Sequence, residues 1–159
     1  MTSGHEKYMA MALREAQKAA EDGEVPAGCV IIDAKSQAIL ARSHNQCEQL
    51  RDATAHAEIL ALTSASAARG AWRLEDTVLY VTKEPCPMCA GAMINSRIQR
   101  VVFGAYDPKA GSFGSVVDLS ALPYNHEPQI VGGVLEGECA DILSSFFKKL
   151  RERKKAVDQ

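Results

Sequence analysis

Four stretches of the chain have the hydrophobic spacing and composition of helices. The first is amphipathic and rich in Ala, Met, Leu, Glu and Lys, and Gly23 follows it as a stop signal. The second is alanine-rich and ends before Gly70, a residue type that commonly follows a helix. Pro85 directly precedes the third predicted helix. The predicted helices span residues 5–22, 55–69, 86–97 and 138–153.

Five short apolar runs lie among these helices and predict strands. The first two flank the polar residues 33–37, which is typical of a hairpin. The third is rich in β-branched and aromatic residues, and the fourth is followed by a loop over residues 106–115 that contains Pro and Gly. The predicted strands span residues 27–32, 38–41, 78–82, 100–104 and 130–135.

The order of these elements predicts an α/β fold in one domain over residues 1–159. Helices and strands alternate in the way that is typical of a three-layer α/β/α sandwich around a central mixed five-stranded sheet. The unit over residues 78–104 forms a right-handed strand–helix–strand crossover if both strands lie in one sheet. Its first strand then leads to a helix N-terminus at the carboxyl edge of the sheet, where open α/β folds place their sites.

The composition is that of an ordinary globular protein, with 159 residues, 47% hydrophobic and 24% charged. No run approaches the roughly 20 apolar residues of a membrane span, and residues 1–8 lack the regions of a secretory signal. We therefore expect a cytoplasmic protein without a membrane partner. The net charge of −2 predicts no general attraction to nucleic acid, so any RNA contact needs a local basic patch.

The candidate chemistry lies in two short segments, His56-Ala57-Glu58 and Pro85-Cys86-Pro87-Met88-Cys89. Because Cys86 and Cys89 are three residues apart on the first turn of a predicted helix, their sulfurs point the same way. A helix N-terminus also favours the thiolate, which is the form that binds metal. Two thiolates and the His56 imidazole give a tetrahedral zinc ion three ligands and leave one position open, which indicates a catalytic site.

Glu58 is the candidate proton carrier beside this metal. Zinc with two thiolates and a neutral histidine is formally neutral, so its water needs a nearby base. Residues two apart on a helix do not share a face. Glu58 is therefore better placed to reach that water than to be a second ligand beside His56.

The cysteine pair has two other interpretations. Five cysteines in an intracellular chain argue against a disulfide framework, but Cys-x-x-Cys also occurs as a redox pair or as half of a structural zinc site. The redox interpretation leaves His-Ala-Glu without a role. A structural site needs a fourth ligand, and none of the remaining candidates has ligand-like spacing: Cys29, Cys47, Cys139, His44 and His126.

Together the two segments match the described signature of zinc nucleobase deaminases, His-x-Glu followed by Pro-Cys-x-x-Cys. The chain resembles the cytidine-deaminase superfamily at these residues. Within it, the chain is similar to the bacterial tRNA-specific adenosine deaminases along nearly its whole length. Lys83 departs from the pattern of these enzymes, in which an apolar residue is common before Glu-Pro-Cys. The similar stretches are residues 24–26, 54–58, 79–98, 100–105, 107–115, 125–126 and 146–147.

This resemblance implies a cytidine-deaminase-like fold with one zinc ion per subunit. His56, Cys86 and Cys89 would be the zinc ligands and Glu58 the proton shuttle. The implied reaction is the hydrolytic deamination of adenosine to inosine at the wobble position of a tRNA anticodon loop. The family acts as a homodimer, so the implied partners are a tRNA anticodon stem-loop and a second copy of the chain.

Several residues are candidates for substrate contacts. The resemblance implies that Asn45 holds the target nucleoside and that the backbone near Ala57 and Glu84 frames the pocket. Asn45 is otherwise a turn residue at the end of a strand. Asp107 and Lys109 open a loop beside the predicted site, where they either contact ribose and phosphate or simply form a turn.

Asn125 becomes a substrate-binding candidate through the resemblance alone. Two rival functions remain: an enzyme for free cytidine, guanine or a nucleotide, and a non-catalytic zinc-stabilised RNA-binding subunit. Glu58 argues against the second, because a structural site has no use for a base. If RNA binds, we expect phosphate contacts at the dense basic cluster of the C-terminus, which otherwise serves helix stability and solubility: Lys148, Lys149, Arg151, Arg153, Lys154 and Lys155.

Overall fold

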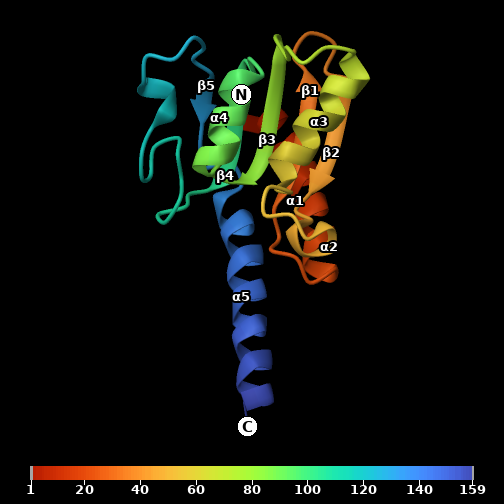
Figure 1. Ribbon diagram of the computed structural model, residues 1–159, viewed down its shortest axis with the longest axis vertical. Helices are drawn as coiled ribbons and strands as arrows, with labels where there is room; N and C mark the ends of the chain where they lie inside the picture. The colour runs from red at the N-terminus through yellow and green to blue at the C-terminus, as the bar shows by residue number, and fades with distance from the viewer. Residues whose placement is uncertain (1, 159) are drawn as a thin grey trace.

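A five-stranded mixed sheet forms the centre of the computed structural model, which describes residues 2–158 (Figure 1). The strand order is β2-β1-β3-β4-β5. Strand β1 pairs antiparallel with β2 and β3, and β4 pairs parallel with β3 and β5. Residues 1 and 159, the ends of the predicted domain, lie outside the described residues. The strands are β1 Gly28–Asp33, β2 Ile39–His44, β3 Thr77–Lys83, β4 Arg100–Ala105 and β5 Gln129–Val131.

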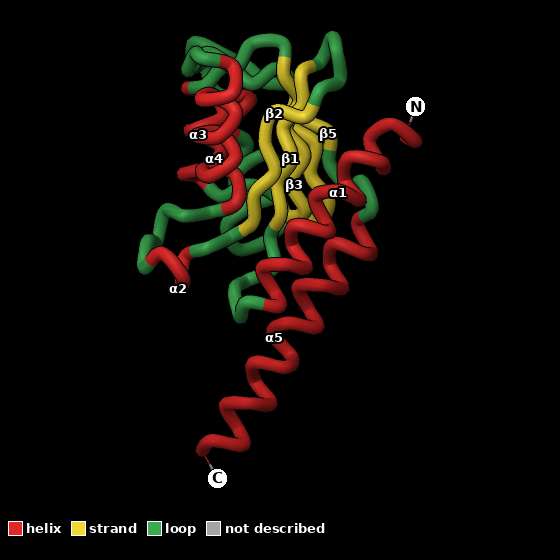
Figure 2. Tube along the Cα trace, turned by 90° about the vertical axis from the view of Figure 1, so that its right-hand side faces the viewer, coloured by secondary structure: helices red, strands yellow, loops and turns green. Residues whose placement is uncertain are grey.

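Helices cover both faces of the sheet, which confirms the predicted three-layer α/β fold. Figure 2 shows α3 and α4 on one face and α1 and α5 on the other. Helix α5 continues past the edge of the sheet, and its last turns project away from the rest of the chain (Figures 1 and 2). Among residues 2–158, no helix combines the length and the apolar character needed to cross a membrane. The helices are α1 Thr2–Glu21, α2 Cys47–Leu50, α3 Ala57–Arg69, α4 Pro87–Asn95, the 3-10 helix η1 Leu119–Ala121 and α5 Glu136–Asp158.

The side chains of β1 explain why both faces of the sheet are covered. Cys29 and Ile31 are buried in the core cluster that includes residues of α3 and α4. Val30 and Ile32 are buried in the second cluster, which includes residues of α1. Because successive residues of a strand point to opposite faces, a strand that is apolar throughout must lie between two helix layers.

Strands β3 and β4 bring the predicted site together. They are parallel neighbours, with Val81 opposite Phe103 and Lys83 opposite Ala105, and α4 connects them as the predicted crossover requires. Both strands therefore end at the same edge of the sheet. The segments that follow them in sequence begin at that edge, which is the usual position of a site in such folds.

Several elements have bounds that the pattern does not predict. Strand β5 is shorter than expected because Gly132 packs against Phe103, where a side chain would not fit, and Gly133 has a positive φ of 84°. Strand β2 extends to His44 because its polar residues pair with β1 although they lack an apolar pattern. Cys86 is the N-cap of α4 rather than its first residue. Helix α5 is longer at both ends than predicted, and α2 and η1 are absent from the prediction.

Candidate metal centre and active site

Two helix N-termini meet at the edge of the sheet where β3 ends, which is the lower edge in Figure 1. His56 is the N-cap of α3 and Cys86 is the N-cap of α4, and both have extended backbone. Cys89 lies in the first turn of α4 and is buried. Because helix N-termini carry partial positive charge, this position stabilises thiolates.

The structure brings the three predicted metal ligands together. Nδ1 of His56 lies 3.6 Å from Sγ of Cys86 and 3.4 Å from Sγ of Cys89. Bonds of about 2.3 Å to sulfur and about 2.0 Å to nitrogen at a tetrahedral zinc ion put these atoms about 3.5 Å apart, so the observed separations fit such an ion. Among residues 2–158 no further His, Cys, Asp or Glu joins the group, whose ligand atoms lie within 4.8 Å of one another. The chain thus supplies three ligands.

Hydrogen bonds within this group set the protonation of its thiols. The pKa of Cys86 is lowered to about 4, chiefly by its hydrogen bond with Cys89 and further by its contact with His56. The same hydrogen bond, together with burial, raises the pKa of Cys89. The hydrogen bond with Cys86 raises the pKa of His56. The group therefore favours a thiolate on Cys86, the form that binds a metal.

Glu58 lies beside the ligand group, in the first turn of α3 and two residues after His56. The side chain is buried, and this burial raises the pKa of its carboxyl group. It lies close to Cys89 but is not one of the clustered ligands. A carboxyl group whose pKa is shifted toward neutrality is suited to accept and return a proton.

A cavity of about 330 Å³ opens next to the ligand group. Its volume is at the small end of the range for ligand pockets. His56, Glu58 and Cys86 form part of its wall, so a molecule in the cavity contacts both the ligand group and the carboxyl group. Four of the six predicted substrate-contact residues also line it: Asn45, Ala57, Glu84 and Asp107.

Lys109 and Asn125, the other two predicted substrate-contact residues, lie outside this lining. The backbone N–H of Lys109 donates to Oδ1 of Asp107 at 3.0 Å, so Lys109 lies close to the rim. Asn125 precedes His126, whose Nε2 lies 2.6 Å from the carbonyl oxygen of Ile98, just before β4 begins. Asn125 is therefore near the end of β4 opposite to the metal group.

Lys83 and Phe147 also line the cavity, and the sequence assigned neither of them a role. Lys83 is the last residue of β3, and its Nζ lies 3.3 Å from Oδ2 of Asp107. Burial alone would raise the pKa of Asp107. The hydrogen bond from the backbone N–H of Lys109 and the charge of Lys83 outweigh this effect and lower the pKa. Phe147 lines the cavity from α5, so the last helix contributes to the site. Only the similarity of residues 146–147 to the deaminases pointed toward this aromatic side chain.

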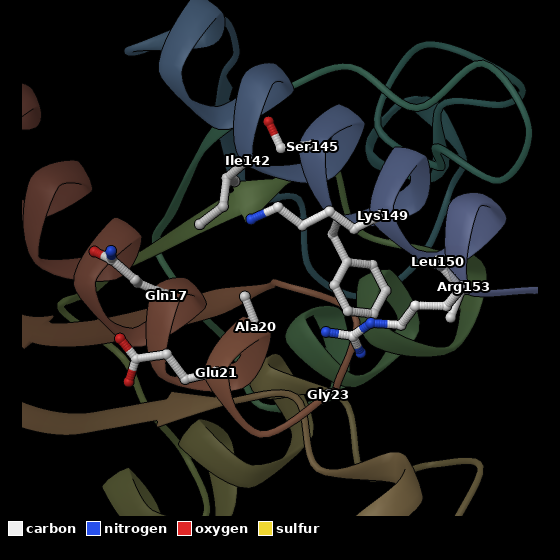
Figure 3. A pocket seen from close by; sticks show the side chains of 10 residues that line it. Gln17, Ala20, Glu21, Gly23, Ile142, Ser145, Lys149, Leu150 and Arg153 are labelled. Carbon is white, nitrogen blue, oxygen red and sulfur yellow. The ribbon is translucent and has the colours of Figure 1, made fainter. Parts of the chain in front are cut away.

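A larger groove of about 410 Å³ lies between α1 and α5. Figure 3 shows Gln17 and Glu21 of α1 on one side of it and Lys149 and Arg153 of α5 on the other. None of the three candidate metal ligands lines this groove. The smaller cavity, which borders the candidate metal ligands, is therefore the candidate active site.

Comparisons with known proteins find similar chains over nearly the whole length of this one. The family described as MafB19-like deaminase matches residues 3–151. The chain is 51% identical over 153 residues to a tRNA-specific adenosine deaminase of Bacillus subtilis (strain 168), which covers 96% of this chain and 94% of that protein. It is 44% identical over 149 residues to the protein of that name in Streptococcus pyogenes serotype M1, covering 93% and 86% of the two chains.

A solved structure extends this similarity to three dimensions. It comes from biochemical and structural studies of A-to-I editing by tRNA:A34 deaminases at the wobble position of transfer RNA. It matches the present fold with a TM-score of 0.83 at 43% sequence identity, covering 86% of this chain and 99% of that one.

The three-layer fold and the clustered His, Cys and Cys side chains define a deaminase of the cytidine-deaminase-like class. The sequence identities place the chain more narrowly. It belongs to the family of tRNA-specific adenosine deaminases. The resemblance inferred from the sequence is thereby confirmed.

Proposed function

We propose that this chain catalyses the hydrolytic deamination of adenosine to inosine at the wobble position of a tRNA anticodon loop. The observation that carries the proposal is the cavity whose wall combines the ligand group with Glu58. The chain also shares 51% and 44% identity with relatives that are named for adenosine deamination on tRNA. A hairpin loop suits a small enzyme because its nucleotides are already partly unstacked.

Zn²⁺ is the metal that His56, Cys86 and Cys89 are proposed to hold, with one ion per subunit. One imidazole and two thiolates form a donor set that suits zinc, and the separations of their atoms fit a tetrahedral ion. When bound, the ion would supply the Lewis acidity that makes water nucleophilic at neutral pH.

Glu58 is proposed to move protons during the reaction. Its carboxylate accepts a proton from the attacking water and delivers it to N1 of the purine. It then carries the second proton of that water, from the new hydroxyl on C6, to the amino nitrogen, which leaves as ammonia. Water adds its oxygen to C6 of adenine, the bond between C6 and the amino nitrogen breaks, and ammonia departs. The products are inosine and ammonia, so all atoms of adenosine and water are accounted for.

Asn45 and Asp107 are proposed to hold the nucleoside. The carboxamide of Asn45 is fixed by a hydrogen bond to the carbonyl oxygen of Val25 at 3.2 Å and by one from the N–H of Cys47 at 3.4 Å. This leaves one N–H and one lone pair of Asn45 for the substrate. Asp107 is suited to accept a hydrogen bond from a ribose hydroxyl.

Of the remaining predicted contacts, two are proposed to act at the border of the site and two beyond it. The backbone near Ala57 and Glu84 frames the base, because both residues line the cavity. Lys109 and Asn125 lie outside the lining and are proposed to contact RNA beyond the target nucleoside.

We further propose that the chain forms a homodimer and, because its substrate is tRNA, acts in the cytoplasm. The outer face of α3 and α4 has a shallow concavity whose lining combines the apolar side chains of Ile59, Leu62, Trp72 and Ala92 with polar ones. Trp72 is 61% exposed. Apolar side chains grouped on one exposed face are typical of an interface, which supports this face as the contact between subunits.

The proposed function is tested by offering the purified protein two kinds of substrate. One is an anticodon stem-loop with adenosine at the wobble position, and the other is free adenosine, cytidine or guanine. We expect inosine in the stem-loop, measured by sequencing before and after incubation, and no turnover of the free compounds. Deamination confined to the free compounds would contradict the proposal and favour a nucleoside or nucleobase enzyme.

A further inference from the structure

Two buried glutamates outside the ligand group, Glu24 and Glu84, hold loops that border the cavity. Glu24 is 1% exposed and Glu84 is 2% exposed. Among residues 2–158, neither carboxylate forms a salt bridge. A buried charge without a cation is costly unless hydrogen bonds replace its water. The hydrogen bonds that these carboxylates accept therefore indicate their role.

Glu84 is hydrogen bonded to the loop that follows β4. Its Oε1 accepts from the N–H of Asp107 at 3.0 Å and from the hydroxyl of Ser115. Its Oε2 accepts from the N–H of Phe113 at 3.2 Å and of Ser115 at 3.1 Å. These donors fill the roughly four acceptor sites of a carboxylate. A Cβ at Gly111 would overlap the carboxylate, so the loop can wrap this closely only with glycine there.

Glu24 likewise accepts hydrogen bonds from the backbone of a loop, the one between β2 and α3. Its Oε1 accepts from the N–H of Glu48 at 2.9 Å and its Oε2 from the N–H of Gln49 at 2.7 Å. These N–H groups belong to the first turn of α2, where no earlier carbonyl of the helix can reach them. The N-cap residue, Gln46, makes no side-chain cap of its own. Asn45, which lines the cavity, directly precedes the N-cap residue Gln46.

We infer that Glu24 and Glu84 are positioning residues for deamination. Each carboxylate fixes one loop, so that Asn45 and Asp107 stand in their binding geometry before the substrate arrives. The inference rests on the proposed function, because that function assigns Asn45 and Asp107 to the nucleoside. Hydrogen bonds from backbone N–H groups to a carboxylate are stronger than those to neutral acceptors. Loops that are ordered in advance also lower the entropic cost of binding.

The test replaces each carboxylate with a carboxamide of the same shape. In Glu84→Gln and Glu24→Gln one acceptor oxygen becomes an NH₂ group that faces N–H donors, so the loop loses hydrogen bonds. We expect the KM for the stem-loop to rise about tenfold, the factor that one hydrogen bond to a charged group typically contributes. Zinc content should be unchanged, and kcat should change much less than KM.

Hydrogen exchange supplies the readout that does not need a substrate. We expect faster exchange in the loop after β4 for Glu84→Gln and in the first turn of α2 for Glu24→Gln, each without an effect on the other loop. Ser115→Ala removes one hydrogen bond to Glu84 and should give a smaller increase in the first loop, which keeps the test decisive if Glu84→Gln does not fold. Glu127→Gln removes the same charge from an exposed residue and is the matched control.

Unchanged loop exchange with an unchanged KM in folded variants would overturn the inference. A loss of zinc and of kcat at constant KM would also overturn it, because that pattern indicates damage to the metal group. If the unmodified chain did not deaminate the stem-loop, the proposed function would fail, whereas exchange would still show whether the two carboxylates fix their loops.

Discussion

In the proposed mechanism, the step of two residues from His56 to Glu58 separates the metal ligand from the proton carrier. His56 is an N-cap residue with extended backbone, whereas Glu58 is already in the first helical turn of α3. The imidazole therefore joins the two sulfurs, while the carboxyl group lies beside them within the same cavity. Burial raises the pKa of Glu58, which suits a group that takes up a proton and returns it.

Replacing Glu58 should remove turnover without removing the metal. We expect Glu58→Gln to lower kcat by about 10²–10⁴-fold, the usual contribution of general acid–base catalysis. Zinc per chain and the melting temperature should stay close to those of the unmodified protein, because the carboxyl group is not a ligand. Glu21→Gln, which makes the same change in the groove between α1 and α5, serves as the control. A Glu58→Gln enzyme with near-normal kcat would remove Glu58 from the mechanism.

The clustering of the three candidate ligands could be predicted from the sequence, because the spacing of these residues keeps their donor atoms together. His-x-Glu and Cys-x-x-Cys keep their donors together on the first turns of two helices. Lys83 and Phe147 could not be predicted in this way. Lys83 reaches Asp107 because β3 and β4 are neighbours, and Phe147 reaches the cavity because α5 packs beside the sheet. Both depend on tertiary contacts that have no local pattern.

At the scale of elements, aromatic side chains attach α1 to β3. Nδ1 of His5 lies 2.9 Å from the hydroxyl of Tyr80, and the ring centroid of Tyr8 lies 5.2 Å from that of Tyr80. Burial, with a smaller contribution from Tyr8, raises the pKa of Tyr80 to about 12. A tyrosine in the unfolded chain has a pKa of about 10. The stabilising effect of the neutral hydroxyl is therefore complete below about pH 10 and is lost as the pH rises toward 12.

The Tyr80→Phe variant tests this attachment. Loss of the hydrogen bond to His5 should lower the free energy of unfolding by about 1 kcal/mol at pH 8. Between pH 10 and 12 the free energy of unfolding should fall less steeply for the variant than for the unmodified protein, because residue 80 no longer titrates. Denaturant unfolding under reducing conditions measures both effects. Tyr124→Phe, at an exposed position, should reproduce the unmodified slope, and an equal slope in Tyr80→Phe would contradict the account.

The presence and type of the main elements could be predicted from periodicity, whereas several of their bounds could not. Strand β5 ends where Gly132 meets Phe103, a contact between segments that are distant in sequence. Helix α2 forms where Glu24 caps its first turn from another part of the chain. Local patterns therefore define elements that bury an apolar face, while elements that depend on distant partners appear only in the folded chain.

At the scale of the whole molecule, charge is distributed unevenly. The chain has a net charge of −2, but residues 148–155 contain six cationic residues and one acidic residue. This segment belongs to the part of α5 that projects beyond the sheet (Figure 1). Phe147, which immediately precedes it, lines the cavity. An RNA whose target base enters the cavity would therefore pass close to the basic segment.

Neutralising the end of this segment should weaken the salt dependence of RNA binding. We expect the double variant Lys154→Gln and Lys155→Gln to raise the KM for the stem-loop. The slope of log KM against log salt concentration should fall by about 0.7–0.9 for each cation that contacts a phosphate. Lys35→Gln is the control, because Lys35 pairs with Asp76 before β3 begins, at the opposite edge of the sheet from the cavity. Equal slopes for the unmodified protein, the double variant and the Lys35→Gln control would show that Lys154 and Lys155 are solvated and contact no phosphate.

The proposed deamination requires one zinc ion, which His56, Cys86 and Cys89 are proposed to hold. The most direct test is to remove metal from the purified chain, add Zn²⁺ back in steps and measure the rate of inosine formation in the stem-loop. We expect no activity without metal and a linear rise that ends at one zinc ion per chain. Full activity in the metal-free protein, or a rise that ends at any other ratio, would contradict this expectation.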